Sequence, residues 1–455
     1  MRNPGKIASL SPIMFYSVNH LMGEKLTAFF SRTGITWLPA VFGKAMLAQR
    51  IAFVWLLLAS GMGFSQTVYV SPDGNNSADG SKSHPVQTIG RALELLKSDG
   101  QKKSILLMPG SYYLDAPIRL NSSHNGLVIR SVFPGQAIVK GSKILKPEWQ
   151  AAKNGLYFAT VPVGLNIDIL TINGHKQIMA RYPNYNPDGG HWQGYAADAI
   201  SPERIRKWKN PAGGIFHAMH IAEWGDFHYL IKGINARGEA ILEGGKQNNR
   251  PSEPHPKYRM VENVFEELDA EGEWFQDKQT NTLYLKPFAG TDLKTAVVEA
   301  GILKNLVEIK GTEDQPAENI WIDGIRFEQS CRTILDTYEP LLRSDWTIVR
   351  NGAIYIEGAR NCRVSECEFT NLEGNVVFVS GFNREVRIEK NHIHDCGASG
   401  ICFVGNPDAV RSPLFRYEQY VDFEQLDKIP GPKGNNYPSN CVADNNLIYR
   451  IGRLE

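Results

Sequence analysis

The segments Gly352-Ala-Ile-Tyr-Ile-Glu-Gly358, Asn375-Val-Val-Phe-Val-Ser-Gly381 and Ser399-Gly-Ile-Cys-Phe-Val-Gly405 repeat one pattern. The third residue of each segment is β-branched, and these residues follow one another at spacings of 23 and 24. The fifth residue is apolar and the last is glycine in all three. A fixed period in this range is typical of a solenoid, in which each repeat stacks on the one before it.

The repeats continue past the glycine with further short apolar runs. We align three such runs: Val364, Cys367 and Phe369; Ile388, Asn391 and Ile393; Val442, Asn445 and Leu447. Runs this short and this rich in β-branched residues favour strands, because a helix needs apolar residues three and four apart over a longer stretch. About three strands in each turn predict an all-β fold, a right-handed parallel β-helix with equivalent residues stacked. We expect Asn391 and Asn445 to form one column that satisfies buried backbone groups.

The N-terminal region does not follow the repeat. A positively charged stretch precedes an apolar run at residues 51–59, and small residues follow it up to Ser65. This pattern predicts a secretory signal peptide cleaved after Ser65, and the run is too short to span a bilayer comfortably. Residues 1–45 fit no structural element, so we expect a start codon assigned too early, with Met46 as the first residue. Residues 1–65 are therefore assigned to a signal peptide with an extension, and the mature chain is expected in the periplasm or outside the cell.

The repeat register divides the rest of the chain. Residues 66–141 form the first coils, and a helix over residues 88–97 carries one apolar stripe that would cap the open end of the core. The register is lost afterwards and returns at residues 307–311. Because a segment this long is not a loop, residues 142–303 are predicted to be an inserted β-rich domain. Residues 304–455 continue the coils, and we expect a chain truncated at its C-terminus.

Composition excludes some classes of partner. The chain has 49 Lys and Arg residues against 48 Asp and Glu residues, so no net field favours nucleic acid or a lipid surface. The six cysteines lie between Cys331 and Cys441, and we favour free, buried thiols over disulfides. Asp73, Asn75 and Asp79 have carboxylate and amide oxygens suited to calcium, but turn formation explains them better. No metal or cofactor is expected.

Several phrases of the sequence carry a resemblance to a known family. They are Tyr69-Val-Ser-Pro-Asp-Gly74, Pro85-Val-Gln-Thr-Ile89, Ile172-Asn-Gly-His-Lys-Gln-Ile-Met-Ala-Arg-Tyr-Pro-Asn184, His220-Ile-Ala-Glu-Trp-Gly-Asp-Phe-His-Tyr229, Gly272-Glu-Trp-Phe-Gln-Asp277 and Thr282-Leu-Tyr-Leu285. Over residues 67–455 the chain resembles glycoside hydrolase family 141 with its insertion domain. The resemblance implies action on plant polysaccharides, with fucosidase- or xylanase-like activity. The family's chains run through several more coils, which implies that its catalytic coils lie past residue 455.

We choose catalytic candidates in this chain by the chemistry that glycoside hydrolysis requires. Glycoside hydrolysis uses two carboxylates, about 5–5.5 Å apart for retention or about 6.5–9.5 Å apart for inversion. Glu373 and Asp395 fall on neighbouring turns and could line one edge of a groove, although solvated turn acids are the simpler interpretation. His392 and His394 are expected to point outward as surface residues rather than to relay protons.

Candidates for substrate binding lie in the insert. Aromatic side chains there could form a wall on which sugars stack: Trp192, Trp224, Trp274, His191 and His228. Tryptophans that hold a small β-domain together are the alternative. Arg181 could bind a hydroxyl or carboxylate, or brace the insert against the coils.

Three functions fit the sequence. The leading hypothesis is an exported, monomeric glycoside hydrolase whose partner is a polysaccharide or oligosaccharide. A polysaccharide lyase on the same scaffold would need clustered Lys or Arg bases, and few occur in the repeat strands. A non-catalytic, carbohydrate-binding β-helix protein is the third hypothesis, because a fold alone does not give a function.

Overall fold

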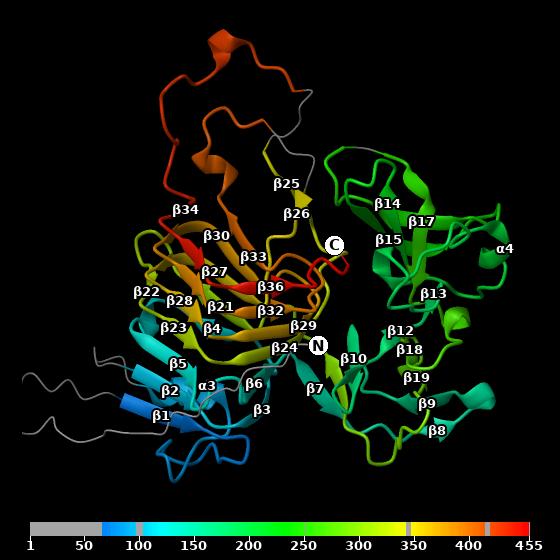
Figure 1. Ribbon diagram of the computed structural model, residues 1–455, viewed down its shortest axis with the longest axis horizontal. Helices are drawn as coiled ribbons and strands as arrows, with labels where there is room; N and C mark the ends of the chain where they lie inside the picture. The colour runs from blue at the N-terminus through cyan, green and yellow to red at the C-terminus, as the bar shows by residue number, and fades with distance from the viewer. Residues whose placement is uncertain (1–65, 97–102, 251, 343–346, 415–418, 455) are drawn as a thin grey trace, which may run out of the picture. The chain divides into compact units, whose positions relative to one another are not determined.

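In the computed structural model, residues 66–96, 103–250, 252–342, 347–414 and 419–454 are described. Three parallel sheets surround one apolar core and place successive coils side by side (Figure 1). The first sheet contains β1 (Gln66–Val70), β2 (Lys103–Leu107), β5 (Leu127–Ser131), β23 (Trp321–Asp323), β28 (Arg363–Ser365), β31 (Arg387–Glu389) and β35 (Val442–Asp444). The second contains β4 (Ile118–Leu120), β21 (Val307–Lys310), β27 (Ile354–Arg360), β30 (Val377–Arg384) and β33 (Ile401–Val404), with β22 (Ala317–Glu318) and β34 (Pro438–Ser439) paired beside it. The third contains β3 (Gly110–Tyr113), β6 (Ala137–Lys140), β24 (Arg326–Ser330), β29 (Glu368–Leu372), β32 (His392–His394) and β36 (Leu447–Tyr449).

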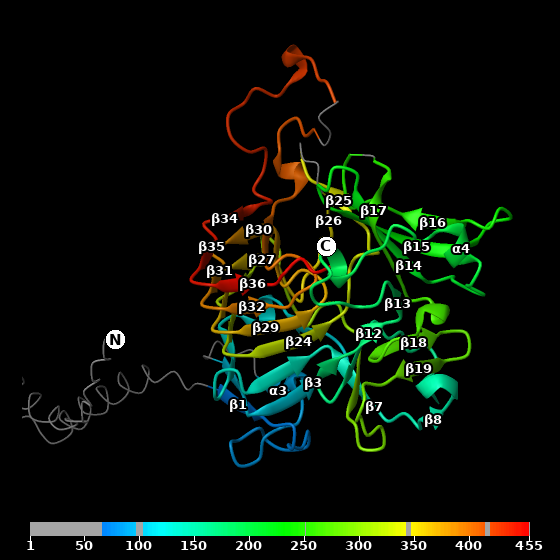
Figure 2. The same cartoon turned by 45° about the vertical axis from the view of Figure 1, so that its right-hand side comes forward.

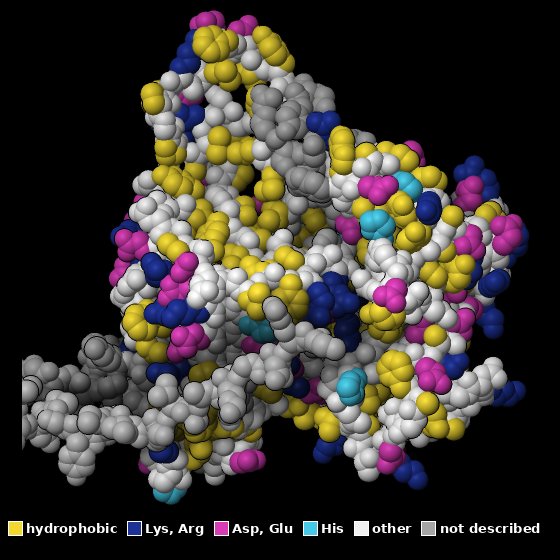
Figure 3. All heavy atoms as spheres, in the orientation of Figure 1, with side chains coloured by type: hydrophobic (Ala, Val, Ile, Leu, Met, Phe, Trp, Pro, Cys, Tyr) yellow, Lys and Arg dark blue, Asp and Glu magenta, His cyan; other side chains and the backbone are white. Residues whose placement is uncertain are grey.

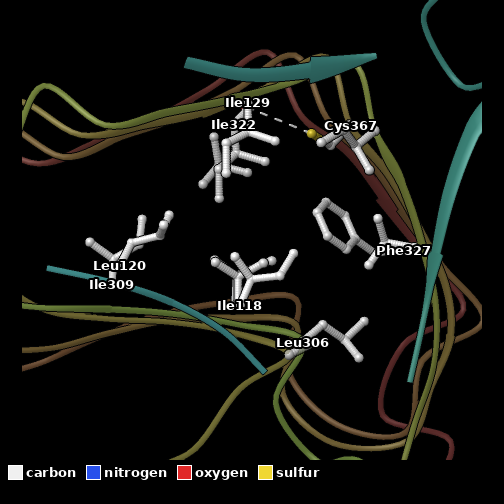
Figure 4. Close-up of a cluster of buried hydrophobic side chains, with 14 of the residues drawn as sticks. Ile118, Leu120, Ile129, Leu306, Ile309, Ile322, Phe327 and Cys367 are labelled. Carbon is white, nitrogen blue, oxygen red and sulfur yellow. Dashed lines mark hydrogen bonds between the residues drawn. The ribbon is translucent and has the colours of Figure 1, made fainter. Parts of the chain in front are cut away.

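The repeat register predicted for the second sheet is confirmed. Ile354 pairs with Val377, and Val377 pairs with Ile401, so equivalent residues stack in parallel strands. Inside the third sheet the rings of Phe327 and Phe369 stack with centroids 5.2 Å apart. Figure 4 shows the inward side chains of several coils meeting in the core. The expected parallel β-helix is therefore present, and its interior is apolar.

The asparagine column is also present, but its last member differs from the prediction. Asn391 Oδ1 accepts from the Cys367 N–H, and its amide donates to the Val364 carbonyl and to Asn446 Oδ1. The residue above Asn391 is thus Asn446, and Ile388 and Ile393 pair with Ala443 and Ile448. The predicted alignment of Val442, Asn445 and Leu447 was therefore wrong by one position throughout. Asn445 occupies the preceding corner, with a φ of 52° in the left-handed region. Asparagine tolerates that conformation, and two adjacent asparagines hid the shift.

Replacing Asn391 with an apolar residue of similar size should measure what this column contributes to stability. We expect Asn391→Leu to lower the free energy of unfolding by about 2 kcal/mol, because the buried Cys367 N–H and Val364 carbonyl lose their partner. Urea denaturation followed by circular dichroism would show the loss as an earlier midpoint. The same change at exposed Asn210 is the control. An Asn391 variant as stable as that control would contradict a structural role for the column.

A short helix closes the N-terminal end of the core. Helix α3 (Ile89–Leu95) buries Ile89 and Ala92 against the first coils, and Thr88 Oγ1 accepts from the Arg91 N–H at its start. The predicted helix thus ends at Leu95, and its last predicted position lies outside the described residues. The loop before the helix forms Asx turns, since Asn75 and Asp79 accept from the N–H groups two residues on.

The cysteines are free thiols, and five of the six are buried. Cys362, Cys367 and Cys396 belong to the apolar core of the coils. Their Sγ atoms contact backbone carbonyls of the same or the neighbouring coil. The cysteines are therefore small, weakly polar side chains that fill the narrow interior. This confirms the prediction of free, buried thiols in place of disulfides.

The stretch predicted as an insert holds three further, mostly antiparallel sheets. One contains β7 (Ser142–Leu145), β10 (Ile169–Ile172), β11 (His175–Lys176) and β20 (Val298–Gly301). The next contains β8 (Gln150–Ala151), β9 (Tyr157–Thr160), β12 (Ile178–Met179), β18 (Glu273–Asp277) and β19 (Thr282–Lys286). The outermost contains β13 (Arg181–Tyr182), β14 (Ile215–His220), β15 (Asp226–Ile234), β16 (Ala240–Gly244) and β17 (Pro254–Glu262), with the short helix α4 (Pro202–Ile205) beside it (Figure 2).

A buried glutamate joins the insert to the coils at its base. Glu299 of β20 accepts from Lys140, Tyr113 and Thr171 at 2.6–2.7 Å, and also from Gln329. Burial alone would raise the pKa of Glu299, but these donors outweigh it and hold the pKa at about 2. The coils and the insert belong to one compact unit.

The predicted signal peptide and extension, residues 1–65, lie outside the described residues. Among the residues that are described, no helix is both long and apolar enough to cross a membrane.

Candidate functional site

A groove of 730 Å³ lies where the insert meets the last coil. Its insert side comes from the turn around the short 3-10 helix η3 (His191–Gln193), from Tyr195 and from Tyr258 of β17. Its other side comes from Arg450 to Arg453, after β36. Figure 3 shows Lys and Arg side chains gathered at this boundary. We call it the aromatic groove.

Four aromatic side chains shape the insert side of this groove. Tyr258 meets His191 and Tyr195 edge to face, each with ring centroids 4.7 Å apart. These three rings are half-buried, whereas Trp192 is only 6% exposed and packs on Met219 and Met260. Half-exposed rings beside charged groups are the surface that the C–H face of a sugar can cover.

A chain of buried polar groups runs from the groove into the insert. Trp192 Nε1–H donates to Asp226 at 3.2 Å, and Asp226 lies 3.4 Å from His228 Nε2. His228 Nδ1 and His217 Nδ1 are 2.7 Å apart, and His217 Nε2 lies 3.2 Å from Glu262. Both imidazoles are fully buried. The groove is therefore linked to the base of the insert by an unbroken line of polar contacts.

The hydrogen bonds decide where the protons lie. His217 donates Nε2–H to Glu262 and is neutral, since burial lowers the pKa of His217 to about 4. Its Nδ1 must then accept a hydrogen bond from His228 Nδ1–H. His228 Nε2 lies 3.4 Å from Asp226 Oδ1, so the other nitrogen of this imidazole faces a carboxylate. Burial raises the pKa of Asp226, but His228 outweighs it and holds the pKa below its usual range.

The chain ends on an arginine of the coils. Arg332, two residues after β24, pairs with Glu262, and its guanidinium makes two hydrogen bonds with Asp168, at 2.8 and 3.0 Å. Burial alone would raise the pKa of Glu262, but the charge of Arg332 outweighs it and holds the pKa of that carboxyl well below its usual range. A cavity of about 90 Å³ adjoins these groups. Lys176 and Glu373 line its rim, 2.5 Å apart.

The two acids predicted as a catalytic pair have separate partners. Glu373 is buried and pairs with Lys176 of β11. Asp395 is bound by Arg450 at 2.5 Å, by Arg453 at 2.8 Å and by His394 at 2.8 Å. Asp395 thus supports the arginine side of the aromatic groove, and Glu373 lines the smaller cavity.

The predicted binding residues divide between the groove and the interior. Trp192 lines the groove although it is largely buried, whereas His228 and Trp274 lie in the interior. Arg181 is buried too, and its guanidinium donates to the carbonyls of Pro183, Trp192 and Gly194. This geometry braces the turn that presents Trp192. Trp224 is 44% exposed and stacks on His220 outside the groove.

Several residues of the site were not identified from the sequence: Tyr195, Tyr258, Asp226, His217 and Arg332. His217 and His228 sit opposite each other in the β14–β15 hairpin, and a hairpin alignment could have placed them together. Arg332 had no such signal, because its partners lie far away in sequence. Among the described residues, one group has the donor atoms for a metal ion: Glu368, His392 and His394.

Comparison with known proteins supports the fold. A family model described as a right handed beta helix region matches residues 309–412. A solved structure titled "Glycoside hydrolase" is 17% identical, with a TM-score of 0.68 over 86% of this chain and 74% of that chain. Another, titled "The complex structure of XylC with xylose", is 12% identical, with a TM-score of 0.44 over 85% of this chain and 54% of that chain. No curated protein matches at a significant level. This chain therefore has the right-handed parallel β-helix fold seen in a glycoside hydrolase, and membership of family 141 stays a prediction.

Proposed function

We propose that the protein is an exported, monomeric glycoside hydrolase that binds a plant polysaccharide in the aromatic groove. The observation that carries the proposal is the groove itself, in which half-exposed rings on the insert face two arginines on the coils. The shared fold and the resemblance of residues 67–455 to family 141 favour the same class. Fucosidase- and xylanase-like specificity are the finer proposals.

The two sides of the groove suit different parts of a sugar. The rings of Tyr195 and Tyr258 offer apolar surface to the C–H face of a pyranose. Arg450 and Arg453 offer N–H donors to hydroxyl or carboxylate oxygens. Both arginines are held by Asp395, so their positions are set before a ligand binds. Prior positioning lowers the entropy that binding must overcome.

Asp226 is the one carboxylate among the described residues that line this groove. Since His228 keeps its pKa low, Asp226 stays ionised near neutral pH. An ionised carboxylate suits a nucleophile, a base or the stabilisation of positive charge in an oxocarbenium-like transition state. We propose this role for Asp226, and the acid of the pair is not assigned.

Tyr258→Ala tests the groove as the binding surface. We expect about tenfold weaker retention in affinity gels that contain xylan or fucosylated xyloglucan, because tyrosine is enriched among the few contact residues whose truncation costs more than about 1 kcal/mol. Trp321→Ala removes an exposed aromatic from β23, outside the groove, and is the control. Equal retention of Tyr258→Ala and the native chain would contradict the assignment of the groove.

The reaction is tested on the native chain with the same polysaccharides. New reducing ends that disappear in Asp226→Asn would support hydrolysis with Asp226 in the site. Products that absorb in the ultraviolet through a new double bond would instead indicate a lyase. Retention without any product would favour a binding protein. The absence of both retention and product would refute the proposal.

A further inference from the structure

We propose that Glu368, His392 and His394 bind a divalent metal ion of the zinc class on the outer face of the third sheet. One ligand atom from each of the three side chains lies within 4.8 Å of the others. The proposal does not depend on the aromatic groove or on sugar binding. It goes against the expectation, drawn from sequence spacing, that no metal site is present.

The β-helix itself brings the three side chains together. His392 and His394 are alternate residues of β32, so both point outward while Ile393 is buried between them. Glu368 of β29 pairs directly with His392 in the parallel register. The centroids of the two imidazole rings lie 4.3 Å apart. All three ligands therefore sit on rigid, adjacent strands rather than on loops.

His394 lies between two carboxylates, and this position calls for a cation. Its Nδ1 is 2.8 Å from Asp395 Oδ2, and its Nε2 is 3.2 Å from Glu368 Oε1. If Nδ1–H donates to Asp395, Nε2 carries a lone pair that faces a second negative oxygen. A cation between Nε2 and Glu368 would contact both of these ligand atoms. A histidine that donates its other nitrogen to a carboxylate is a usual metal ligand.

The surrounding groups orient the remaining ligands. His392 Nε2 is 3.0 Å from the Tyr449 hydroxyl, and the Tyr449 ring stacks on His394 with an interplanar angle of 8°. Arg326 lies 3.6 Å from Glu368 Oε2, on the oxygen that does not face His394. Asp395 also binds Arg450 and Arg453, which fix the carboxylate behind the imidazole. Each ligand thus has a second residue that limits its rotation.

The donor set indicates which ion fits. Two imidazoles and one carboxylate form the His₂Glu set of open zinc sites, with a fourth position left for water or a ligand. Calcium and magnesium prefer sets made only of oxygen, so they should bind poorly here. Nothing in the described surroundings supplies a thiolate, because the cysteines nearby face the core.

Cobalt(II) and zinc titrations of the full chain, first freed of metal with a chelator, test the proposal. We expect one cobalt per chain, with the intense visible absorption of a four-coordinate site, and competition by zinc but not by calcium or magnesium. His392→Ala and His394→Ala should each abolish this absorption. Asp395→Asn should weaken zinc binding about 10–100-fold, as loss of an outer carboxylate does.

Exposed His84→Ala is the matched control and should bind cobalt like the native chain. Circular dichroism of the metal-free variants would establish that they are folded. Cobalt absorption that persists in the double variant His392→Ala/His394→Ala would overturn the proposal. So would the absence of saturable cobalt binding by the native chain.

Discussion

Replacing Arg332 with methionine should lower the free energy of unfolding by about 3–5 kcal/mol. Arg332 is buried between Asp168 and Glu262, and both carboxylates come from the insert. Methionine keeps an unbranched apolar stem but leaves two acids close together without their cation. A buried charge that loses its partner is strongly destabilising, whereas an exposed pair contributes about 1 kcal/mol or less.

Urea denaturation followed by tryptophan fluorescence would measure this effect, because most described tryptophans lie in the insert: Trp149, Trp192, Trp208, Trp224 and Trp274. Arg91→Met, which removes the exposed pair with Glu94, is the control and should change the midpoint little. The triple variant Arg332→Met/Asp168→Asn/Glu262→Gln should recover part of the lost stability. An Arg332→Met variant as stable as the native chain would show that the two acids are neutralised in some other way.

The same arginine illustrates how the insert is attached. Arg332 lies two residues after the end of β24, so the coil sets the position of its backbone, and its N–H donates to Asp168 at 2.6 Å. Glu262 joins it to the two histidines behind the aromatic groove. Loss of Arg332 should therefore disturb the groove as well as stability. Weaker polysaccharide retention by Arg332→Met, with Tyr258 intact, would reveal this coupling.

The fold was predictable because its information is local and repeated. Ile354, Val377 and Ile401 mark the same strand in three coils, and parallel stacking follows from their spacing. The prediction failed by one residue over the last run, from Val442 to Leu447, because a long insertion precedes this coil and two adjacent asparagines fit the pattern. Hydrogen bonds to Asn391 decide between them, and sequence spacing does not.

The candidate site was predictable only in part. Trp192 and Arg181 were recognised by residue type, but their burial depends on how the turn before Tyr195 folds back on β17. The pairing of Arg332 with Asp168 spans 164 residues and has no periodic signal. The β32 histidines were correctly placed outward, yet the carboxylates beside His394 come from another strand and a corner. Contacts between segments that do not repeat need the structure.

Replacing Glu273 with glutamine should remove a loss of stability that the native chain suffers as pH rises. Glu273 is 1% exposed, and one of its oxygens accepts from the N–H groups of Asp269 and Ala270, both at 2.9 Å. Burial raises the pKa of Glu273 to about 7, against the opposing effect of these two hydrogen bonds. The folded chain therefore holds this proton more tightly than the unfolded chain, whose carboxyl has the ordinary value of 4.5.

The sign of the effect follows from linkage. A carboxyl with a raised pKa favours folding when protonated, so its contribution is largest below pH 4.5, declines between pH 4.5 and 7, and is lost above pH 7. The native chain should lose about 3 kcal/mol relative to Glu273→Gln between pH 4 and pH 8, at about 1.4 kcal/mol for each pKa unit. Urea denaturation of both chains at the two pH values measures this difference. The contributions of the other titrating groups are common to both chains and cancel in the comparison. Exposed Glu271→Gln should leave the native pH dependence unchanged. A stability difference between Glu273→Gln and the native chain that is the same at both pH values would contradict this prediction. It would mean that folding does not raise the pKa of Glu273.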